Sequence, residues 1–155
     1  QVSGRNVFLG YYKNEEATRE AFTEDGWFKT GDMGILRGGH LFLKGRIKCM
    51  ILSSNGQNIY PEELEAVINN VPYVIDSLVV EDTNGLTAII LPDYATASAD
   101  GIEAAELEGR LRSKMPEINK QLPAYAPIRK MEFRQEDFER TPKKNIKRYL
   151  YLKKK

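Results

Sequence analysis

The sequence has 155 residues, enough for one ordinary domain or for a small domain joined to part of another. Apolar residues make up 41% and charged residues 29%, and the formal net charge of +1 gives no general electrostatic attraction for nucleic acid. The single cysteine excludes an internal disulfide framework and fits a reducing compartment, and no apolar run is long enough to span a membrane.

The first 45 residues predict short β elements and turns. Val7 to Tyr12 has the apolar and aromatic composition of a strand, and Glu15 to Phe22 has the apolar spacing of a short helix. The turn sequence Arg37 to His40 lies between two apolar runs, which is typical of a β-hairpin. This region has too little apolar sequence to form a core of its own. We therefore expect it to be the end of a larger β-rich domain, and the chain to be part of a longer protein.

The sequence pattern of residues 45–65 changes twice, from that of a strand to that of a polar loop and then to that of a helix. Met50 to Leu52 is a short apolar run of strand type, and the polar residues after it contain Asn55-Gly56, a pair that favours a tight turn. Pro61 then begins a helix, where its missing N–H costs nothing, and acidic residues follow near the positive end of the helix dipole. Such a loop can present backbone amides to a ligand, but most polar loops only connect two elements.

Residues 46–155 are the part of the sequence that we expect to fold by itself. The helix that begins at Pro61 carries an apolar stripe with i, i+3, i+4, i+7 spacing, formed by Leu64, Val67, Ile68 and Val71. Two β-rich runs, 74–80 and 86–91, join across a second hairpin signature at 82–85. A helical pattern follows from 104 to 122, in which Pro116 predicts a kink or two abutting helices, and 128–133 is a third strand. This order predicts an α+β fold, a small three-stranded sheet covered by helices.

One long motif in the joint between these regions carries a family resemblance. It reads Gly45-Arg46-x-Lys48, then Ser54-x-Gly56-x-Asn58-Ile59-x-Pro61-x-Glu63-x-Glu65. The motif resembles the joint between the two domains of the adenylate-forming superfamily, which contains acyl-CoA synthetases, nonribosomal adenylation domains and luciferases. Runs at 6–18 and 26–32 are similar to the same superfamily, and are nearest to its long-chain fatty acyl-CoA synthetases. The resemblance extends from about Val7 to Tyr149.

The resemblance implies a domain division and a two-step reaction. Residues 1–45 would be the end of a large AMP-binding domain, and 46–155 a mobile C-terminal domain with its hinge near Lys48. In the complete protein a fatty acid carboxylate would attack the α-phosphate of ATP, releasing pyrophosphate and leaving an acyl-adenylate. The thiol of coenzyme A would then attack the acyl carbon and release AMP. The family's phosphate loop, acid pocket and Mg-binding Glu belong to the large N-terminal domain, so we expect the isolated chain to be inactive.

The same resemblance implies roles for particular residues. Asp32 falls on the family residue that accepts hydrogen bonds from both ribose hydroxyls of ATP, and the two oxygens of a carboxylate suit a cis-diol. Arg46 falls on an arginine that contacts the nucleotide, and Lys48 on the hinge, whose torsions change as the C-terminal domain swings. Ser54 and Gly56 fall on the loop that approaches the pantetheine arm of coenzyme A. The alternatives for Lys48 and Gly56 are an ordinary exposed lysine and an ordinary turn glycine.

The resemblance also reaches a C-terminal motif, where this sequence departs from the family. Residues 139–148 resemble Thr-x-x-Gly-Lys-Ile-x-Arg, whose lysine bonds the carboxylate substrate and an α-phosphate oxygen in the first half-reaction. In a gapless alignment Asn145 stands at the position of that lysine, and Lys144 at that of the glycine. Lys144 can take the role after a one-residue shift of the loop, or Lys143 or Lys147 can take it. Otherwise the first half-reaction is impaired, because a neutral Asn is a poor partner for a phosphate. We favour Lys144.

Other functions stay open beside a fatty acid–CoA ligase. One is an adenylating enzyme that loads a carrier protein or stops at the acyl-adenylate, and another is a non-catalytic binding module derived from a synthetase. A nucleic-acid binder is disfavoured, because the acidic helix start at Pro61 interrupts any continuous basic face. The segment from Arg140 to Lys155 contains basic but no acidic residues, which allows peripheral contact with a membrane. We expect a cytoplasmic protein, and the sequence contains no metal-ligand cluster.

Overall fold

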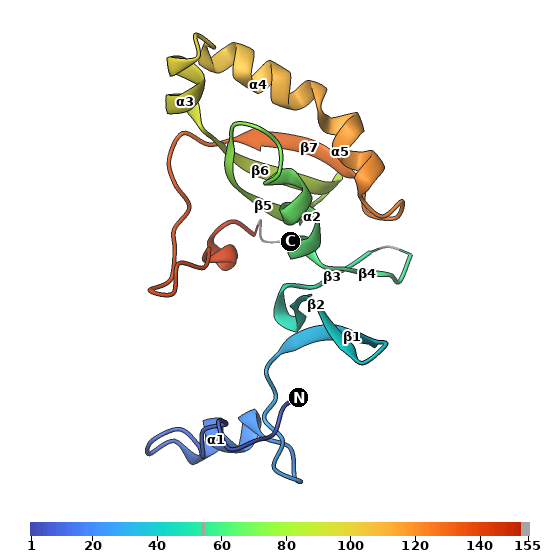
Figure 1. Ribbon diagram of the computed structural model, residues 1–155, viewed down its shortest axis with the longest axis vertical. Helices are drawn as coiled ribbons and strands as arrows, with labels where there is room; N and C mark the ends of the chain where they lie inside the picture. Colours follow the sequence, from blue (N-terminus) through green and yellow to red (C-terminus); the bar gives the residue numbers. More distant parts are fainter. Residues whose placement is uncertain (54, 153–155) are drawn as a thin grey trace. The chain divides into compact units, whose positions relative to one another are not determined.

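The computed structural model describes residues 1–53 and 55–152, and the chain divides into two compact units (Figure 1). The first unit comprises Gln1–Cys49 and the second Met50–Lys155. Every residue of the first unit is at least partly exposed, whereas the buried hydrophobic residues all belong to the second. The expectation that the first 45 residues have too little apolar sequence for their own core is therefore confirmed.

Helix α1 (Glu15–Ala21) and a small aromatic cluster organise the start of the first unit. The side chain of Asn14 accepts a hydrogen bond from the backbone N–H of Ala17 and so caps the helix. The prediction of a strand over Val7 to Tyr12 is wrong, since its only strand-type pairing is an isolated bridge between Tyr11 and Asn14. Its aromatic residues pack instead, with the Phe8 ring centroid 5.4 Å from that of Phe22 and 5.0 Å from that of Phe28.

The predicted hairpin of the first unit is present. Strand β1 (Asp32–Arg37) pairs antiparallel with β2 (His40–Arg46), and the pairing places Asp32 opposite Arg46 at the open end. The 3-10 helix η1 (Ile47–Cys49) follows and ends the unit. The hairpin therefore fixes the spacing between an acidic and a basic side chain that are fourteen positions apart in the sequence.

The second unit begins with a two-residue ladder and a helix. Strand β3 (Ile51–Leu52) pairs with β4 (Asn58–Ile59), and helix α2 (Pro61–Ile68) starts at the predicted proline. Of the predicted apolar stripe, Val71 lies beyond the end of the helix. It still packs against the same core as Leu64 and Ile68, because the turn that follows α2 returns to the sheet.

The predicted three-stranded sheet is also present, with strand order β5-β6-β7. Strands β5 (Val74–Asp82) and β6 (Gly85–Pro92) form the expected antiparallel hairpin, while β7 (Ile128–Phe133) pairs parallel to β6. Parallel pairing needs a crossover, which three helices supply: α3 (Tyr94–Ala99), α4 (Ala104–Ser113) and α5 (Met115–Gln121). The predicted helical run is thus two abutting helices, with Pro116 in the first turn of α5, and α3 is an additional short helix.

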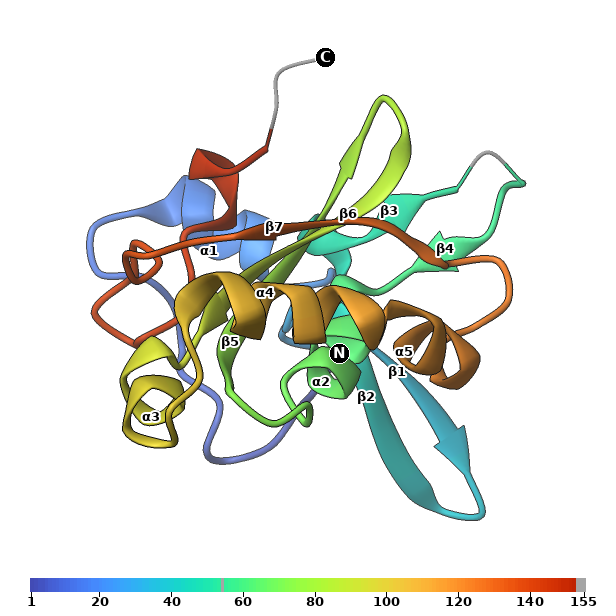
Figure 2. The same ribbon diagram turned by 90° about the horizontal axis from the view of Figure 1, so that it is seen from above.

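The two faces of this sheet have different covers (Figure 2). Side chains alternate along β5, so Val79 faces a core shared with α2 and α5, while Leu78 and Val80 face a second cluster. That second cluster is closed by Phe138, Ile146 and Tyr151 of the C-terminal segment, which contains the 3-10 helix η2 (Arg148–Leu150). The C-terminal segment is therefore part of the fold's core, and it carries the predicted lysine loop. Among the described residues, no helix combines the length and the apolar character needed to cross a membrane.

Candidate functional site

The two residues expected to contact the nucleotide lie together at the open end of the β1–β2 hairpin. Nη1 of Arg46 donates a hydrogen bond to Oδ1 of Asp32 over 2.9 Å, and the two side chains keep 58% and 32% of their surface exposed. Gly31 has a φ of +76°, which turns the chain into the strand, and its carbonyl accepts from the N–H of Ile47. The pair thus presents a carboxylate and a guanidinium side by side to solvent, a combination that can bond a diol and a phosphate.

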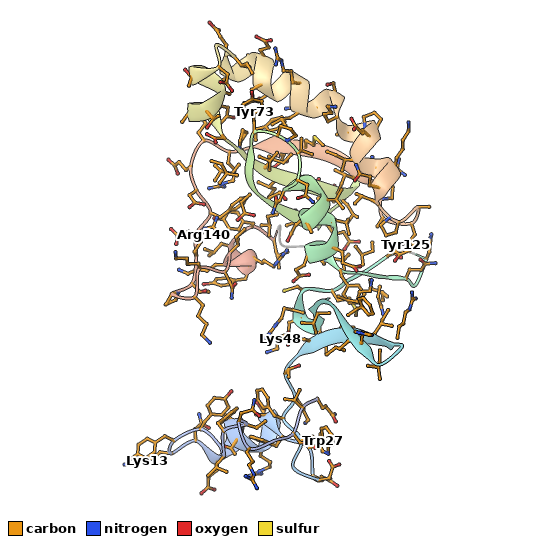
Figure 3. All side chains as sticks on the ribbon, viewed as in Figure 1. Lys13, Trp27, Lys48, Tyr73, Tyr125 and Arg140 are labelled. Atoms are coloured by element: carbon orange, nitrogen blue, oxygen red, sulfur yellow. The ribbon has the colours of Figure 1, made fainter. Side chains whose placement is uncertain are left out.

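The predicted hinge residue, Lys48, lies in η1 and is exposed (Figure 3). The next residue is the last of the first compact unit, so the position of Lys48 coincides with the joint between the units. The structure holds a single conformation, and the hinge role of Lys48 stays a prediction.

The loop expected to approach coenzyme A is the turn between β3 and β4. The N–H of Gly56 donates to the carbonyl of Ser53 over 2.9 Å, and Gly56 has a φ of +73° with no atom within 4 Å of the place where a Cβ would stand. The positive φ favours a glycine here, and the open surroundings leave its backbone accessible. Ser54, the other residue predicted for this site, lies outside the described residues.

Substituting Gly56 with alanine should lower the free energy of unfolding by about 1 kcal/mol, because alanine is strained at positive φ. Gly109, in the middle of α4 and also without neighbours at its Cβ position, is the matched control. There alanine should raise stability by about 0.5 to 1 kcal/mol, since it is the better helix former. Urea denaturation followed by far-ultraviolet circular dichroism measures both variants, and an equal effect of the two substitutions would contradict the role of φ at Gly56.

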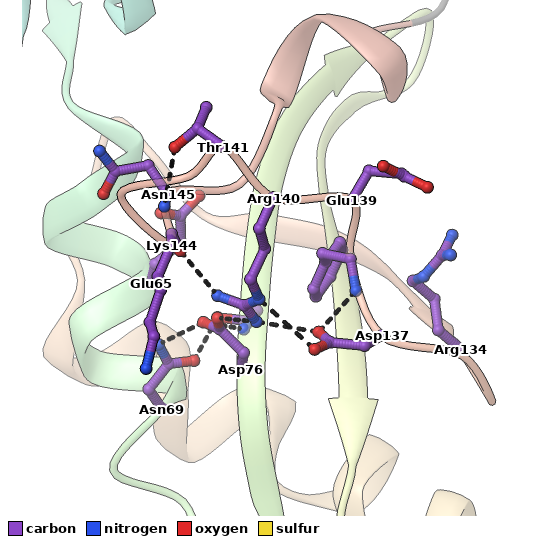
Figure 4. Close-up of polar contacts among 12 residues, drawn as sticks. Glu65, Asn69, Asp76, Arg134, Asp137, Glu139, Arg140, Thr141, Lys144 and Asn145 are labelled. Atoms are coloured by element: carbon purple, nitrogen blue, oxygen red, sulfur yellow. Dashed lines mark hydrogen bonds and ion pairs between the residues drawn. The ribbon is translucent and has the colours of Figure 1, made fainter.

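The predicted lysine loop is a tight hairpin-like turn from 141 to 145 (Figure 4). The N–H of Thr141 donates to the carbonyl of Asn145, and the N–H of Lys144 to the carbonyl of Thr141, each over 2.8 Å. Lys144 has a φ of +63°, a conformation that glycine adopts most easily. Its backbone therefore matches the glycine position of the aligned motif. Lys144 and Asn145 are both exposed, and Figure 4 shows their side chains leaving the loop in different directions.

An ionic network ties this loop to the sheet, although sequence reasoning did not single it out (Figure 4). Nη2 of Arg140 lies 2.9 Å from Oδ2 of Asp76 on β5 and 2.9 Å from Oδ1 of Asp137. Nη1 of Arg140 donates to the backbone carbonyl of Lys144 over 3.2 Å. The partners Asp76 and Arg140 are 64 positions apart, so only the fold brings them together.

A second ion pair joins two of the motif segments. Arg148 Nη1 donates to Glu65 Oε1 over 2.8 Å, and Nη2 bonds the other carboxylate oxygen, so the contact is bidentate. The same carboxylate accepts from the N–H of Val79 over 2.7 Å, which links α2, β5 and η2. Burial raises the pKa of the Glu65 carboxyl, and the hydrogen bonds and charge of Arg148 act against that rise. Glu65 and Arg148, which belong to two different sequence motifs, therefore form a structural ion pair with each other.

The structure places the predicted residues in separate sets. Asp32, Arg46 and Lys48 belong to the first unit, whereas Gly56, Lys144 and Asn145 belong to the second. The hairpin brings Asp32 and Arg46 together, and the 141–145 turn holds Lys144 beside Asn145, whereas Lys48 lies in η1 and Gly56 in the separate turn between β3 and β4. Among the described residues, no group of three or more His, Cys, Asp or Glu side chains could hold a metal ion.

Comparison with known families gives a match that covers nearly all of the second unit. The family model for the AMP-binding enzyme C-terminal domain matches residues 49–154. This range begins within η1 and includes the sheet, its covering helices and the 141–145 loop.

Relatives of this chain include two classes of enzyme. A nonribosomal peptide synthetase (btyA) of Aspergillus terreus is 37% identical over 117 residues, which cover 68% of this chain and 12% of the relative. Long-chain-fatty-acid–CoA ligase 1 of Saccharomyces cerevisiae is 42% identical over 97 residues, which cover 61% of this chain and 14% of the relative. The chain thus spans about one eighth of the length of the curated relatives it matches.

Solved structures extend the likeness to almost the whole chain. The crystal structure of ATP-bound MatB from Rhodopseudomonas palustris matches with a TM-score of 0.70 and 28% identity, covering 96% of this chain and 28% of that one. The likeness therefore includes the β1–β2 hairpin as well as the second unit.

Proposed function

Because the chain belongs to the AMP-binding enzyme C-terminal domain family, we propose that it is the C-terminal part of an ATP-dependent fatty acid–CoA ligase. The adenylate-forming superfamily expected from the sequence motifs is thereby confirmed, and so is the α+β fold. The long-chain ligase among its relatives supports the choice of substrate. The observation that carries the proposal is the Asp32–Arg46 pair, which stands just before the matched family domain and offers a diol acceptor next to a cation.

In the proposed reaction the described residues bind and orient. Asp32 would accept hydrogen bonds from the ribose hydroxyls of ATP, and Arg46 would contact the nucleotide. Lys144 would supply positive charge near the α-phosphate while the carboxylate attacks, which stabilises charge that develops during transfer. After the C-terminal domain reorients about Lys48, the open backbone at Gly56 would lie along the pantetheine arm of coenzyme A. One mobile domain would then orient two different nucleophiles in turn.

The cofactors of the proposed reaction are ATP, coenzyme A and Mg²⁺. The described residues contain no cluster of carboxylates that fits a metal ion, so no step of the mechanism is assigned to Mg²⁺ on this chain. We place its ligand in the N-terminal domain of the same protein, together with the fatty acid pocket. That domain is the principal partner of this chain.

The complete protein should show ATP–pyrophosphate exchange that depends on a carboxylic acid, strongest with long-chain acids. The 155-residue chain alone should show no exchange and no thioester formation, because it spans only a small part of its enzyme relatives. The measurement is exchange of labelled pyrophosphate over a series of acids of increasing length, followed by thioester detection with free coenzyme A. Thioester formation by the isolated chain would refute the proposal that catalysis needs the N-terminal domain.

A second candidate is an adenylating enzyme that transfers its acyl group to a carrier protein. The observation in its favour is the nonribosomal peptide synthetase among the relatives. Exchange without thioester formation on free coenzyme A would support it. A protein without exchange for any acid would support the non-catalytic binding module, which the replacement of the family lysine by Asn145 permits.

We also propose a cytoplasmic protein that contacts membranes through its C-terminal end. Tyr149, Leu150 and Leu152 are 68%, 51% and 56% exposed, in a segment that contains basic but no acidic residues. The chain should sediment with vesicles that contain anionic lipid, and much less with neutral ones or at high salt. Equal sedimentation with both kinds of vesicle would contradict an electrostatic contact.

A further inference from the structure

The guanidinium of Arg140 connects the predicted lysine loop to the edge of the sheet. It bonds Asp76 on β5, Asp137 just before the loop, and the backbone carbonyl of Lys144 inside the loop (Figure 4). The side chains of Arg140 and Asp76 are only 28% and 22% exposed, so solvent screens their attraction less than it screens an exposed pair. A planar fork with several donors can hold these partners at once, which a single ammonium cannot.

Asp76 is itself held in place for this contact. The register of β5 against β6 shifts between Val74 and Asp76, an irregularity of the kind that re-aims a side chain at a strand edge. Its Oδ1 accepts from Nδ2 of Asn69 over 3.1 Å and from the N–H of Ser77 over 2.9 Å. Oδ2 is thereby directed to Arg140. The anchor of the loop is thus built from three elements: the end of α2, the bulged start of β5 and the segment after β7.

The loop needs such an anchor because packing holds little of it. Residues 142–145 are all exposed, whereas Ile146 joins the sheet cluster. Lys144 also has a positive φ, which an ordinary side chain adopts only at a cost of about 1 kcal/mol. The hydrogen bond from Arg140 to the carbonyl of Lys144 therefore stabilises the residue of the loop whose backbone conformation is unfavourable.

We propose that Arg140 is a positioning residue for the adenylation half-reaction. It fixes the 141–145 loop through the Lys144 carbonyl and the Asp76 carboxylate, and thereby fixes whichever cation of the loop meets the α-phosphate. It does not itself touch the substrate. The catalytic part of this proposal rests on the proposed function, but the anchoring part does not.

Limited digestion of the 155-residue chain with trypsin tests the anchoring part. In Arg140→Gln the bonds after Lys143 and Lys144 should be cut at least 10-fold faster than in the unmodified chain. Cleavage after Lys120, in α5, reports opening of the whole unit and should change less than 2-fold. Arg110→Gln, which removes an exposed ion pair on α4, is the matched control and should leave all these rates unchanged. Unchanged cleavage of the loop in Arg140→Gln, or an equal increase after Lys120, would overturn the proposal.

The complete protein tests the catalytic part by separating the two half-reactions. Arg140→Gln should lower the kcat of pyrophosphate exchange by about 10- to 100-fold, while conversion of supplied acyl-adenylate and coenzyme A to thioester changes less than 2-fold. Arg140→Lys should recover part of the loss. Asp76→Asn should give a smaller defect in the same half-reaction, since Arg140 keeps its bond to the Lys144 carbonyl, and the double variant should be no worse than Arg140→Gln, because Asp76 acts through Arg140. Equal losses in both half-reactions would overturn the positioning role. If the unmodified protein shows no exchange with any acid, the proposed function fails, and the trypsin result alone decides whether Arg140 anchors the loop.

Discussion

Replacing Lys144 with glycine should lower acid-dependent pyrophosphate exchange of the complete protein by about 100-fold or more, a loss typical of removing one group that stabilises transition-state charge. Glycine is the informative substitution, because Lys144 has a φ of +63° and glycine accepts that backbone without strain. The variant should be as stable as the unmodified protein, or about 1 kcal/mol more stable. A loss of activity then reports the missing charge, and exchange kinetics with urea denaturation beside them measure both effects.

Two further variants separate the alternatives for the lysine. Lys143→Ala, in the same exposed turn, should leave exchange within 2-fold and serves as the control. Asn145→Lys restores the lysine at its aligned position and should return most of the exchange to the Lys144→Gly protein. If Lys143→Ala abolishes exchange while Lys144→Gly does not, the assignment of Lys144 is wrong. If only the Asn145→Lys protein shows exchange, the first half-reaction is impaired in the unmodified sequence.

Replacing Arg148 with alanine should lower the free energy of unfolding by about 3 kcal/mol at neutral pH, since it leaves the buried Glu65 carboxylate without its cation. The side chains of Arg148 and Glu65 are only 20% and 9% exposed. Urea denaturation of the 155-residue chain, followed by circular dichroism, measures the loss. The control is Arg110→Ala, which removes an exposed ion pair with Glu106 and should cost about 0.5 kcal/mol or less.

The effect of Arg148→Ala should also depend on pH. Burial already raises the pKa of Glu65, and removing Arg148 removes the contacts that lower it, so the pKa of this carboxyl in the folded variant rises further. A carboxyl with a raised pKa in the folded state contributes stability at low pH and loses it as pH rises through that pKa. The difference between the variant and the unmodified chain should therefore shrink as pH falls from 7 towards 5. A difference below about 1 kcal/mol at pH 7, or one that grows in acid, would show that the pair is not a significant source of stability.

Elements of the fold with strong local signals were predictable from the sequence. The turn sequence at 82–85 predicts the β5–β6 hairpin, and Pro116 predicts the boundary between α4 and α5. Helix α3 was missed because Tyr94–Ala99 is short and buries only Ala97, so it shows no periodicity. Its one local signal is the cap, in which Asp93 accepts from the N–H and the hydroxyl of Thr96. The opposite error, at Val7 to Tyr12, arose because aromatic residues suit a small ring cluster as well as a strand.

The candidate site divides in the same way between local and non-local features. The positions of Asp32, Arg46 and Lys144 follow from motifs that are contiguous in the sequence. The contacts that fix the loop are not contiguous: Glu65 and Arg148 are 83 positions apart, and Asp76 meets Arg140 through a register shift in β5. A charge alone gives no indication of its partner at such separations, so the anchoring of the loop became visible only in the structure.

The C-terminal segment that closes the second face of the sheet has a consequence for how such domains change in evolution. Its residues Phe138, Ile146 and Tyr151 flank the lysine loop and cover Leu78 and Leu91, so a deletion through the loop would expose a hydrophobic face. A requirement for solubility would therefore favour keeping the loop whether or not its residues perform chemistry. A residue of the loop such as Asn145 can then be exchanged without loss of this scaffold, because its side chain is exposed and lies outside the cluster.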